Sequence, residues 1–439
     1  MKRRKLLVVL GIVGIAVFSA STIWAGGADN KTNWSAEYIR TLNRNAATDS
    51  ADIVMYNPAG VMMMEDGLYG NISAHYIAKD YNNKINGMDF DQDKSSIVPG
   101  LFVVSKCDSW AGYFGISNVI GGGKVDFKKG NATTNALGLG IIQAANMMLA
   151  AYGAPSSLYY TGISNQNVEG EHIGLGYTLG VAHKINDMIS LSLGARYVNT
   201  TRKASGSVTI NPTVSVPGVN PPVTARVDYK EKADGVGAII GFDITPSDVV
   251  NIGIHYDTRV DLDYDQTINE DNYNVLGALG VTDGGTRTRN LPGILALGVS
   301  YKFRENWRAE ADLTYYLNKN ADFEDIPGSS RDESAVDNGY DMGIMFEYGF
   351  SETLKGSLGY IYTNTGVDAK DMTPELPELN AHTLGTGVVW KVYPCVDVNF
   401  SIGHVFYKSD SFTSAATGAT IEYEKDITFL ALGFQCQFY

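Results

Sequence analysis

The chain has 439 residues, of which 48 are Gly, 26 are Tyr and 16 are Phe, while only 19% are charged. Glycine and aromatic residues in these numbers are typical of a β-rich protein with tight turns. They argue against helical repeat arrays, which are richer in Ala, Leu, Glu and Lys. The net charge of −14 argues against nucleic-acid binding, which requires a basic face.

The first 25 residues have the three parts of a secretory signal peptide. A basic segment, Lys2–Lys5, is followed by an apolar run from Leu6 to Phe18 and then by small residues up to Ala25. A membrane anchor is the alternative, but the apolar run is short for a transmembrane helix. We therefore predict that residues 1–25 are removed on export. The mature chain would keep 30 basic and 48 acidic residues.

Residues 26–67 are predicted to form a small plug, here called the hatch. Within it, the stretch from Trp34 to Gly60 could form a short helix. Ser35 can cap this helix, and apolar residues follow at helical spacing. The stretch ends in an Asn-Pro-Ala-Gly turn, which stops both helices and strands. We expect the hatch to close a barrel formed by residues 68–439.

After the hatch, apolar side chains alternate with polar or small ones in fourteen segments. These segments lie near 68–78, 97–106, 110–121, 170–183, 189–202, 225–243, 249–266, 290–304, 306–318, 338–350, 353–365, 380–392, 396–409 and 422–439. In the tenth, Tyr340, Met342 and Ile344 share one face, whereas Asp341 and Gly343 lie on the other. Soluble β-sandwiches also alternate. Large aromatic residues, however, gather here at strand ends on the apolar face, which is typical of a membrane barrel with a polar lumen.

The connections between these segments alternate in length. Short ones, such as 184–188 and 351–352, take turns with long ones, such as 122–169 and 267–289. Bacterial outer-membrane barrels have short periplasmic turns and long outer loops. We therefore predict an all-β protein of the bacterial outer membrane. Its fold would be a transmembrane 14-stranded antiparallel β-barrel with the small N-terminal helical hatch plugging the lumen.

The longest connection, 122–169, contains an uncharged, apolar-rich run from Ala136 to Tyr152. A transmembrane helix here would be short and would break the even number of strands. We expect instead one or two amphipathic helices in a large outer loop, with exposed apolar side chains that form a groove for hydrophobic compounds. The candidate residues are Leu137, Leu139, Ile141, Ile142, Met147 and Met148.

Two sequence patches and the last strand resemble the FadL/TodX-type family of outer-membrane transporters. The resemblance is closest over Ala36–Gly67 and includes the hatch motif Asn57, Pro58 and Ala59. The second patch is Leu376–Gly385. The resemblance implies a monomeric fourteen-stranded barrel with an internal hatch, which carries long-chain fatty acids or small aromatic hydrocarbons inward. The chain ends in an alternating strand with an aromatic residue, as expected of a substrate of the barrel assembly machinery.

The family resemblance also implies an inward kink in one early strand, which opens the barrel wall sideways. We expect segment 110–121 to be this gate strand, because Gly112 and Gly115 allow a bulge or a kink there. The passage would then be gated by the hatch and would release its cargo laterally.

Arg196 and Arg308 are predicted to face the lumen, and two interpretations remain open for them. One arginine could bind the carboxylate of a substrate. Alternatively, they could form lumenal ion pairs with Glu310, Asp312 or Glu347.

The sequence has no arrangement that indicates an enzyme, a metal site or a cofactor site. The six histidines and the three cysteines lack the spacing of metal ligands, and no set of Ser, His and acid stands out. Cys395 and Cys436 could pair in the periplasm or stay free. We expect contacts with outer-membrane lipid and lipopolysaccharide. A general diffusion porin, an aromatic hydrocarbon channel and a surface receptor are the alternative functions.

Overall fold

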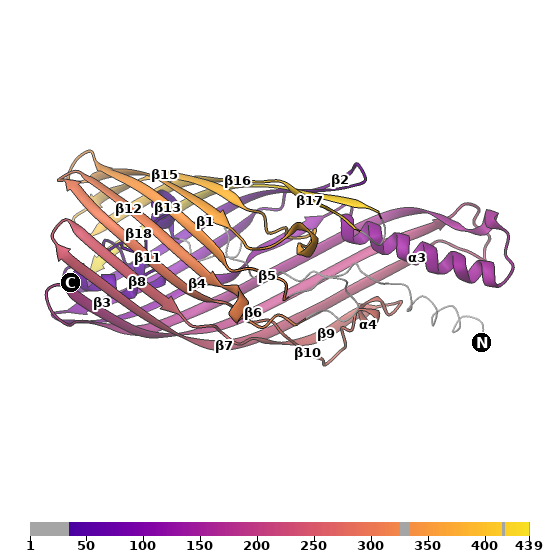
Figure 1. Cartoon of the computed structure of the whole chain (residues 1–439), viewed down its shortest axis with the longest axis horizontal. Helices are drawn as coiled ribbons and strands as arrows, with labels where there is room; N and C mark the ends of the chain where they lie inside the picture. The colour runs from indigo at the N-terminus through magenta and orange to yellow at the C-terminus, as the bar shows by residue number, and fades with distance from the viewer. Residues whose placement is uncertain (1–34, 325–333, 415–417, 439) are drawn as a thin grey trace.

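The computed structural model describes residues 35–324, 334–414 and 418–438. The predicted signal peptide and the first residues of the hatch lie outside these ranges. Within them, the alternating segments form long antiparallel strands around a lumen (Figure 1).

Fourteen strands of the described ranges close into a barrel, which confirms the predicted fold. Each pairs with the next in antiparallel fashion, and β18 returns to β1 with Phe438 opposite Leu68. The strands are β1 (Gly67–Ile85), β3 (Ser96–Cys107), β4 (Trp110–Phe127), β5 (Tyr160–Lys184), β6 (Ile189–Pro212), β7 (Val223–Ser247), β8 (Val250–Asp257), β11 (Gly293–Arg304), β12 (Trp307–Leu317), β13 (Gly339–Gly349), β14 (Leu354–Asn364), β15 (Ala381–Tyr393), β16 (Val396–Tyr407) and β18 (Thr420–Phe438). Shorter strands extend the hairpins at one end: β2 (Met88–Gln92), β9 (Asp263–Asp271), β10 (Thr286–Thr288) and β17 (Asp410–Thr413).

The two ends of the barrel differ in their connections. Short turns join the strands at the end that we call the turn end, and long connections lie at the opposite, loop end. The long connections carry α3 (Ala132–Ala151), η4 (Ser156–Leu158), α4 (Val275–Ala278), η5 (Asn318–Asn320) and η6 (Ala369–Asp371). Among the described helices, none is long and apolar enough to cross a membrane.

At the loop end, β5, β6 and β7 run far beyond the other strands, and α3 lies along this extension (Figure 1). The connection from β4 to β5 is therefore shorter than the expected loop 122–169, because β4 continues to Phe127 and β5 begins at Tyr160. The single strand expected over 249–266 is divided into β8 and β9.

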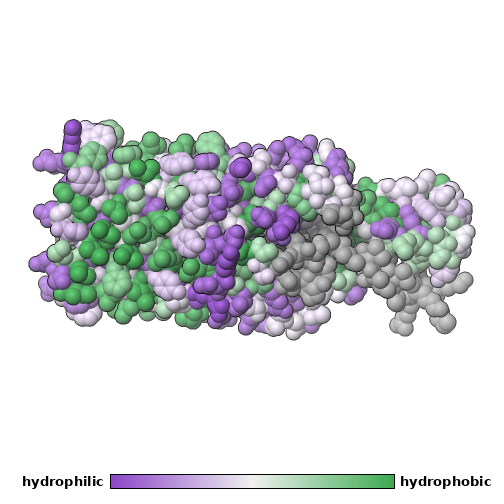
Figure 2. All heavy atoms as spheres, in the orientation of Figure 1, coloured by the Kyte–Doolittle hydropathy of each residue, from purple (hydrophilic) through white to green (hydrophobic). Residues whose placement is uncertain are grey.

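The surface of the barrel is apolar where most soluble proteins are polar. Hydrophobic side chains gather over the part of the barrel nearest the turn end, and hydrophilic ones form a band further toward the loop end (Figure 2). Large exposed side chains include Ile72, Leu179, Leu193, Ile344, Leu358, Phe400 and Leu432. Polar side chains such as His75, Glu310 and Asn399 are instead buried in the interior. A lipid-facing exterior and a polar interior are the arrangement of an outer-membrane barrel.

The described part of the hatch folds inside the barrel as three short helices: α2 (Ala36–Thr41), η2 (Ala51–Met55) and η3 (Pro58–Met63). The Ser35 side chain caps α2 by accepting a hydrogen bond of 2.9 Å from the Tyr38 amide. α2 contacts β14, β15, β16 and β18, while η2 and η3 contact β3 to β7. The hatch thus bridges opposite sides of the wall.

Candidate functional site

The wall of the barrel is interrupted between β3 and β4. The two strands pair only from Cys107 opposite Trp110 to Gly100 opposite Ser117. Beyond this point, residues 96–99 of β3 pair with β1, and β4 pairs with β5. Pro99 lies next to the last β3–β4 pair, and because proline has no N–H it cannot continue a ladder on both sides. We call the place where residues 96–99 of β3 and residues 118–127 of β4 do not pair with each other the wall interruption.

Next to the wall interruption, β4 bends toward the lumen. Its register with β5 shifts between Asn118 and Ile120 and again between Ile120 and Gly123. Val119 and Ile120 are buried, and a Cβ atom on Gly174 of β5 would lie 2.6 Å from the Ile120 Cβ. The absence of that side chain makes room for the inward bend.

The bend does not lie at the glycines that the sequence singled out. Gly112 and Gly115 pair regularly with β3 and β5 on both sides. The positive φ angles lie further along, at Gly121 and Gly123, with φ values of 76° and 86°. The strand expected from the sequence ends at Gly121 and leaves Gly123 in the connection 122–169, whereas both glycines belong to β4. The role of β4 as the gate strand stays a prediction.

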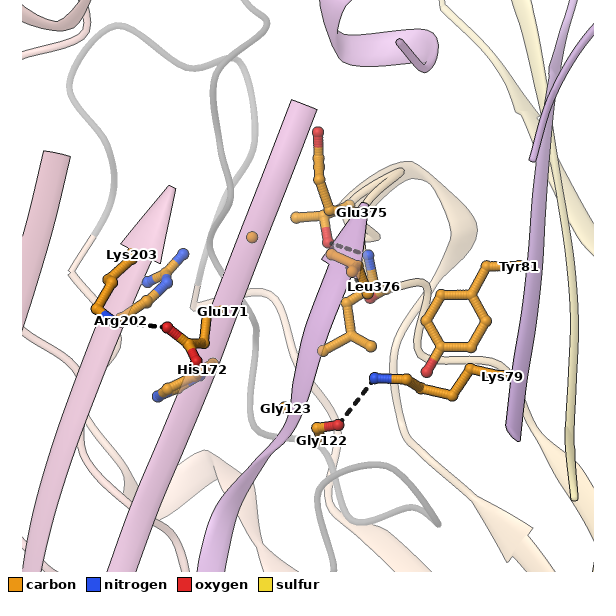
Figure 3. Close-up of a pocket in the computed structure, with 13 residues that line it drawn as sticks. Lys79, Tyr81, Gly122, Gly123, Glu171, His172, Arg202, Lys203, Glu375 and Leu376 are labelled. Carbon is orange, nitrogen blue, oxygen red and sulfur yellow. Dashed lines mark hydrogen bonds and ion pairs between the residues drawn. The ribbon is translucent and has the colours of Figure 1, made fainter. Parts of the chain in front are cut away.

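A cavity of about 50 Å³ lies inside the wall interruption. Lys79 and Tyr81 of β1 line one side of it, and Glu171, His172 and Arg202 line the other (Figure 3). Such a volume has room for roughly one or two water molecules, whereas a cavity that binds benzene needs about 150 Å³. Strands or loops must therefore move before a hydrophobic compound can occupy this place.

Residues 366–380, here called the strap, cover the cavity from the loop end. The Lys425 ammonium of β18 donates a hydrogen bond of 2.6 Å to the Pro377 carbonyl, and the Asn83 side chain of β1 donates one of 2.8 Å to the Pro374 carbonyl. Thr373, Glu375 and Leu376 of the strap line the cavity. The strap includes the start of the second patch, Leu376–Gly385, that resembles the family.

At the turn end, one ion pair joins the hatch to the wall and others connect residues within the hatch. Arg40 pairs with Glu347 of β13, and Arg44 pairs within the hatch with Asp52 at 2.5 Å and with Asp49 at 2.8 Å. Partial desolvation raises the pKa of Asp49, whose side chain is 34% exposed, but the positive charges of Arg44, Arg308 and Arg40 outweigh it and lower the pKa of that carboxyl far below its usual range. Asp49 therefore stays ionised at neutral pH, and the Arg40–Glu347 pair connects the hatch to β13.

The hatch motif docks against β7. The side-chain amide of Asn57 donates a hydrogen bond of 3.0 Å from its Nδ2 to the Phe242 carbonyl. Its Oδ1 accepts one of 3.4 Å from the backbone N–H of Ala59. Pro58 occupies the first turn of η3, where its missing N–H costs no helical hydrogen bond. The motif thus both caps η3 and anchors it to the wall.

The two candidate arginines both have acidic partners. Arg196 pairs with Asp257 at 2.5 Å, and Arg308 pairs with Glu310 at 2.8 Å and with Glu347 at 3.4 Å. This supports the interpretation as lumenal ion pairs. A role in binding a substrate carboxylate stays a prediction.

The six apolar residues proposed as an outer groove lie on different faces of α3. Leu137, Ile141 and Met148 are buried, and Ile142 is half-buried. Leu139 and Met147, in contrast, are 53% and 59% exposed. The buried face of the helix packs against β5 and β6. The residues therefore do not share one groove in this conformation.

Polar contacts connect α3 to the strap. Asn131 caps the helix by accepting a hydrogen bond from the Thr134 amide at 3.1 Å. The same side chain donates one of 2.8 Å to Glu375 of the strap. A movement of α3 would therefore act on the strap.

Cys107, Cys395 and Cys436 are all free thiols, so the possible Cys395–Cys436 disulfide is absent from this structure. The residues that the structure describes contain no group of three or more His, Cys, Asp or Glu side chains arranged to hold a metal ion.

The sequence model of the outer membrane protein transport family (OMPP1/FadL/TodX) matches residues 16–438. A Pseudomonas aeruginosa FadL homologue has a similar structure, with 13% identity and a TM-score of 0.63 over 95% of this chain and 100% of that chain. So does the P. putida toluene transporter TodX, with 13% identity and a TM-score of 0.60 over 95% and 100%. The Ralstonia pickettii toluene transporter TbuX has 15% identity and a TM-score of 0.56 over 89% and 94%. No curated protein sequence matches this chain.

Proposed function

We propose, from the premise that this chain belongs to the outer membrane protein transport family (OMPP1/FadL/TodX), that it carries long-chain fatty acids and releases them sideways between β3 and β4. Its family and its closed barrel make it an outer-membrane transporter of hydrophobic compounds. In the proposed orientation the turn end faces the periplasm and the loop end faces outward, as in other outer-membrane barrels.

The position of the cavity carries the proposal. The cavity lies directly inside the wall interruption. Its lining includes the cations Lys79, Arg202 and Lys203 and the carboxylates of Glu171 and Glu375, but Arg202 and Lys203 already pair with Glu231 and Glu171. A fatty acid has a carboxylate, which suits the Lys79 ammonium, and an apolar tail, which suits the lipid outside the wall. Each Å² of tail kept out of water contributes about 25 cal/mol. A passage through the side of the barrel would serve both parts of such a molecule.

An aromatic hydrocarbon is the second candidate cargo, because two proteins of similar structure are named toluene transporters. A hydrocarbon, however, has no charged group for Lys79 to bind. A general diffusion porin is disfavoured, because the hatch fills the lumen at the turn end with buried side chains such as Ile53 and Val54.

The proposed route can be tested by locking the wall interruption with a disulfide. A Cβ atom on Gly123 would lie 3.0 Å from the Ser96 Cβ, whereas a disulfide needs about 3.8 Å between the two Cβ atoms. Because the φ of 86° at Gly123 strains any side chain, the disulfide also requires the backbone of β4 to adjust locally. The variant Ser96→Cys/Gly123→Cys, with the three native cysteines replaced by Ser, is expressed in cells that lack their own transporter. Uptake of labelled oleate should fall when the pair is oxidised and return after reduction.

The protein with the three native cysteines replaced by Ser and no added cysteine is the control and should take up oleate under both conditions. Uptake that is insensitive to the oxidised disulfide would contradict the lateral route. Uptake of labelled toluene without oleate by the unmodified protein would move the proposal to the hydrocarbon. Conductance of small ions with neither compound taken up would favour a porin.

A further inference from the structure

Lys79 of β1 has an uncommon environment for a lysine. Its side chain is only 4% exposed and lines the cavity inside the wall interruption (Figure 3). The ammonium donates three hydrogen bonds: to the Ser96 hydroxyl at 2.9 Å, to the Gly122 carbonyl at 2.9 Å and to the Lys124 carbonyl at 2.7 Å. All three acceptors are neutral. Among the described residues, no carboxylate lies within 4.0 Å of this ammonium.

These three contacts connect the two sides of the wall interruption. Ser96 lies on β3, which ends its pairing with β4 at Gly100, whereas Gly122 and Lys124 lie on the bent part of β4. The lysine side chain therefore supplies hydrogen bonds in a place where the β-ladder supplies none. A longer contact of 3.4 Å, from the Asp126 amide to the Gln92 side chain, is a second link to β4 further toward the loop end.

A purely structural link would not require a charge. A neutral amide side chain could donate to the same carbonyls, whereas a buried ammonium without a counterion loses much of its solvation energy. The other cations of the cavity are already compensated: Arg202 lies 3.3 Å from Glu231, and Lys203 lies 2.6 Å from Glu171. The uncompensated charge at Lys79 therefore favours an anion in the cavity.

We propose that Lys79 has two roles. It acts as a latch, meaning that its hydrogen bonds hold the wall interruption closed, and it binds the anionic head of the cargo. This inference rests on the proposed function and deepens it. A carboxylate that reaches the cavity accepts a charge-assisted hydrogen bond, which is stronger than the bonds to the neutral carbonyls of Gly122 and Lys124. The ammonium then turns from these carbonyls toward the carboxylate. The bent part of β4 loses its link to β1 and β3, and the interruption widens for the tail of the same molecule.

The proposal predicts that substituting Lys79 weakens the binding of a charged cargo and not that of an uncharged cargo with the same tail. Binding of labelled oleate and of its uncharged ester, methyl oleate, is measured on the purified full-length protein in detergent. Lys79→Met should weaken binding of oleate at least tenfold and leave binding of methyl oleate within about twofold. Lys79→Arg, which keeps the charge, should retain most of the affinity for oleate. Lys84→Met is the matched control, since Lys84 lies on the same strand and pairs with Glu424.

A second measurement follows the latch directly. In the Ser96→Cys/Gly123→Cys variant, oleate should slow formation of the disulfide by widening the interruption, and it should have no such effect when Lys79→Met is added. If Lys79→Met fails to fold, Lys79→Gln, which can still donate hydrogen bonds, replaces it in both measurements.

The outcomes separate this inference from the proposed function. If the unmodified protein binds oleate but Lys79→Met binds it equally well, or loses oleate and methyl oleate alike, the latch is wrong and fatty acid transport stands. If the unmodified protein binds neither compound, both proposals are overturned.

Discussion

Glycines on the lumenal face decide how closely the hatch approaches the wall. A Cβ atom on Gly359 of β14 would lie 1.9 Å from the Thr41 carbonyl oxygen, and one on Gly253 of β8 would lie 1.8 Å from the Asn45 carbonyl oxygen. Both neighbours are backbone atoms of the hatch, which cannot turn away as a flexible side chain could. These positions therefore allow the hatch backbone to lie directly on the strands.

Gly359→Ala should loosen the hatch and leave the barrel folded. Overpacking of this kind costs about 1–3 kcal/mol, which corresponds to a roughly 5- to 150-fold larger undocked population. Arg40 and Arg44 of the hatch are 1% and 0% exposed, so trypsin can cleave after them only when the hatch is undocked. Mass spectrometry should show faster cleavage at both sites in the variant. Gly112→Ala, where nothing lies within 4 Å of the new Cβ, should behave like the unmodified protein; equal cleavage in all three proteins would contradict the close fit.

At the level of the elements, the sequence predicted the fourteen strands because alternation and loop length are properties of neighbouring residues. It placed the gate in segment 110–121 and the bend at Gly112 and Gly115. It did not predict where β3 and β4 stop pairing, because that depends on which of their residues face each other. Pro99 was the available signal, since proline cannot pair on both sides. The sequence also missed three sets of contacts that join residues far apart in the chain. These are the contacts of Lys79, those of the strap, and those between the hatch backbone and wall glycines such as Gly359. Periodicity in the sequence does not indicate such contacts.

Hydrogen bonds attach the strap to the barrel, and their contribution to its stability can be measured. Asn83→Ala removes the hydrogen bond to the Pro374 carbonyl, which contributes about 0.5–1.5 kcal/mol. Amide hydrogen exchange of residues 369–379 should then become roughly 2- to 13-fold faster. Asn82→Ala, on the adjacent, less buried position of β1, is the control and should leave that exchange unchanged. Exchange that is equally fast in both variants would show that Asn83 does not hold the strap.

In the whole molecule, the hatch and the strap close the lumen on either side of the wall interruption. The hatch occupies the lumen from the turn end, and the strap covers the cavity from the loop end. The interruption between β3 and β4 lies between them. A barrel of fourteen strands is wide enough to leave a lumen, so without plugs it would conduct water and ions. With the hatch and the strap both in place, the proposed lateral route through the wall interruption would not require either of them to leave the lumen.

Removal of residues 26–60 should therefore convert a selective transporter into an open pore. The barrel should still form, because its closed ladder of fourteen antiparallel strands does not pass through the hatch. Wall residues that the hatch contacts, such as Glu347 and Glu310, would face water instead of Arg40 and the Ala46 amide, and their charges would be solvated. Planar-bilayer recordings should show steady ion conductance for the deletion variant and closed behaviour for the intact protein. If the deletion variant stays closed, the strap alone seals the lumen. The hatch would then serve mainly to position the inner wall, and the loop end would be the step that controls passage.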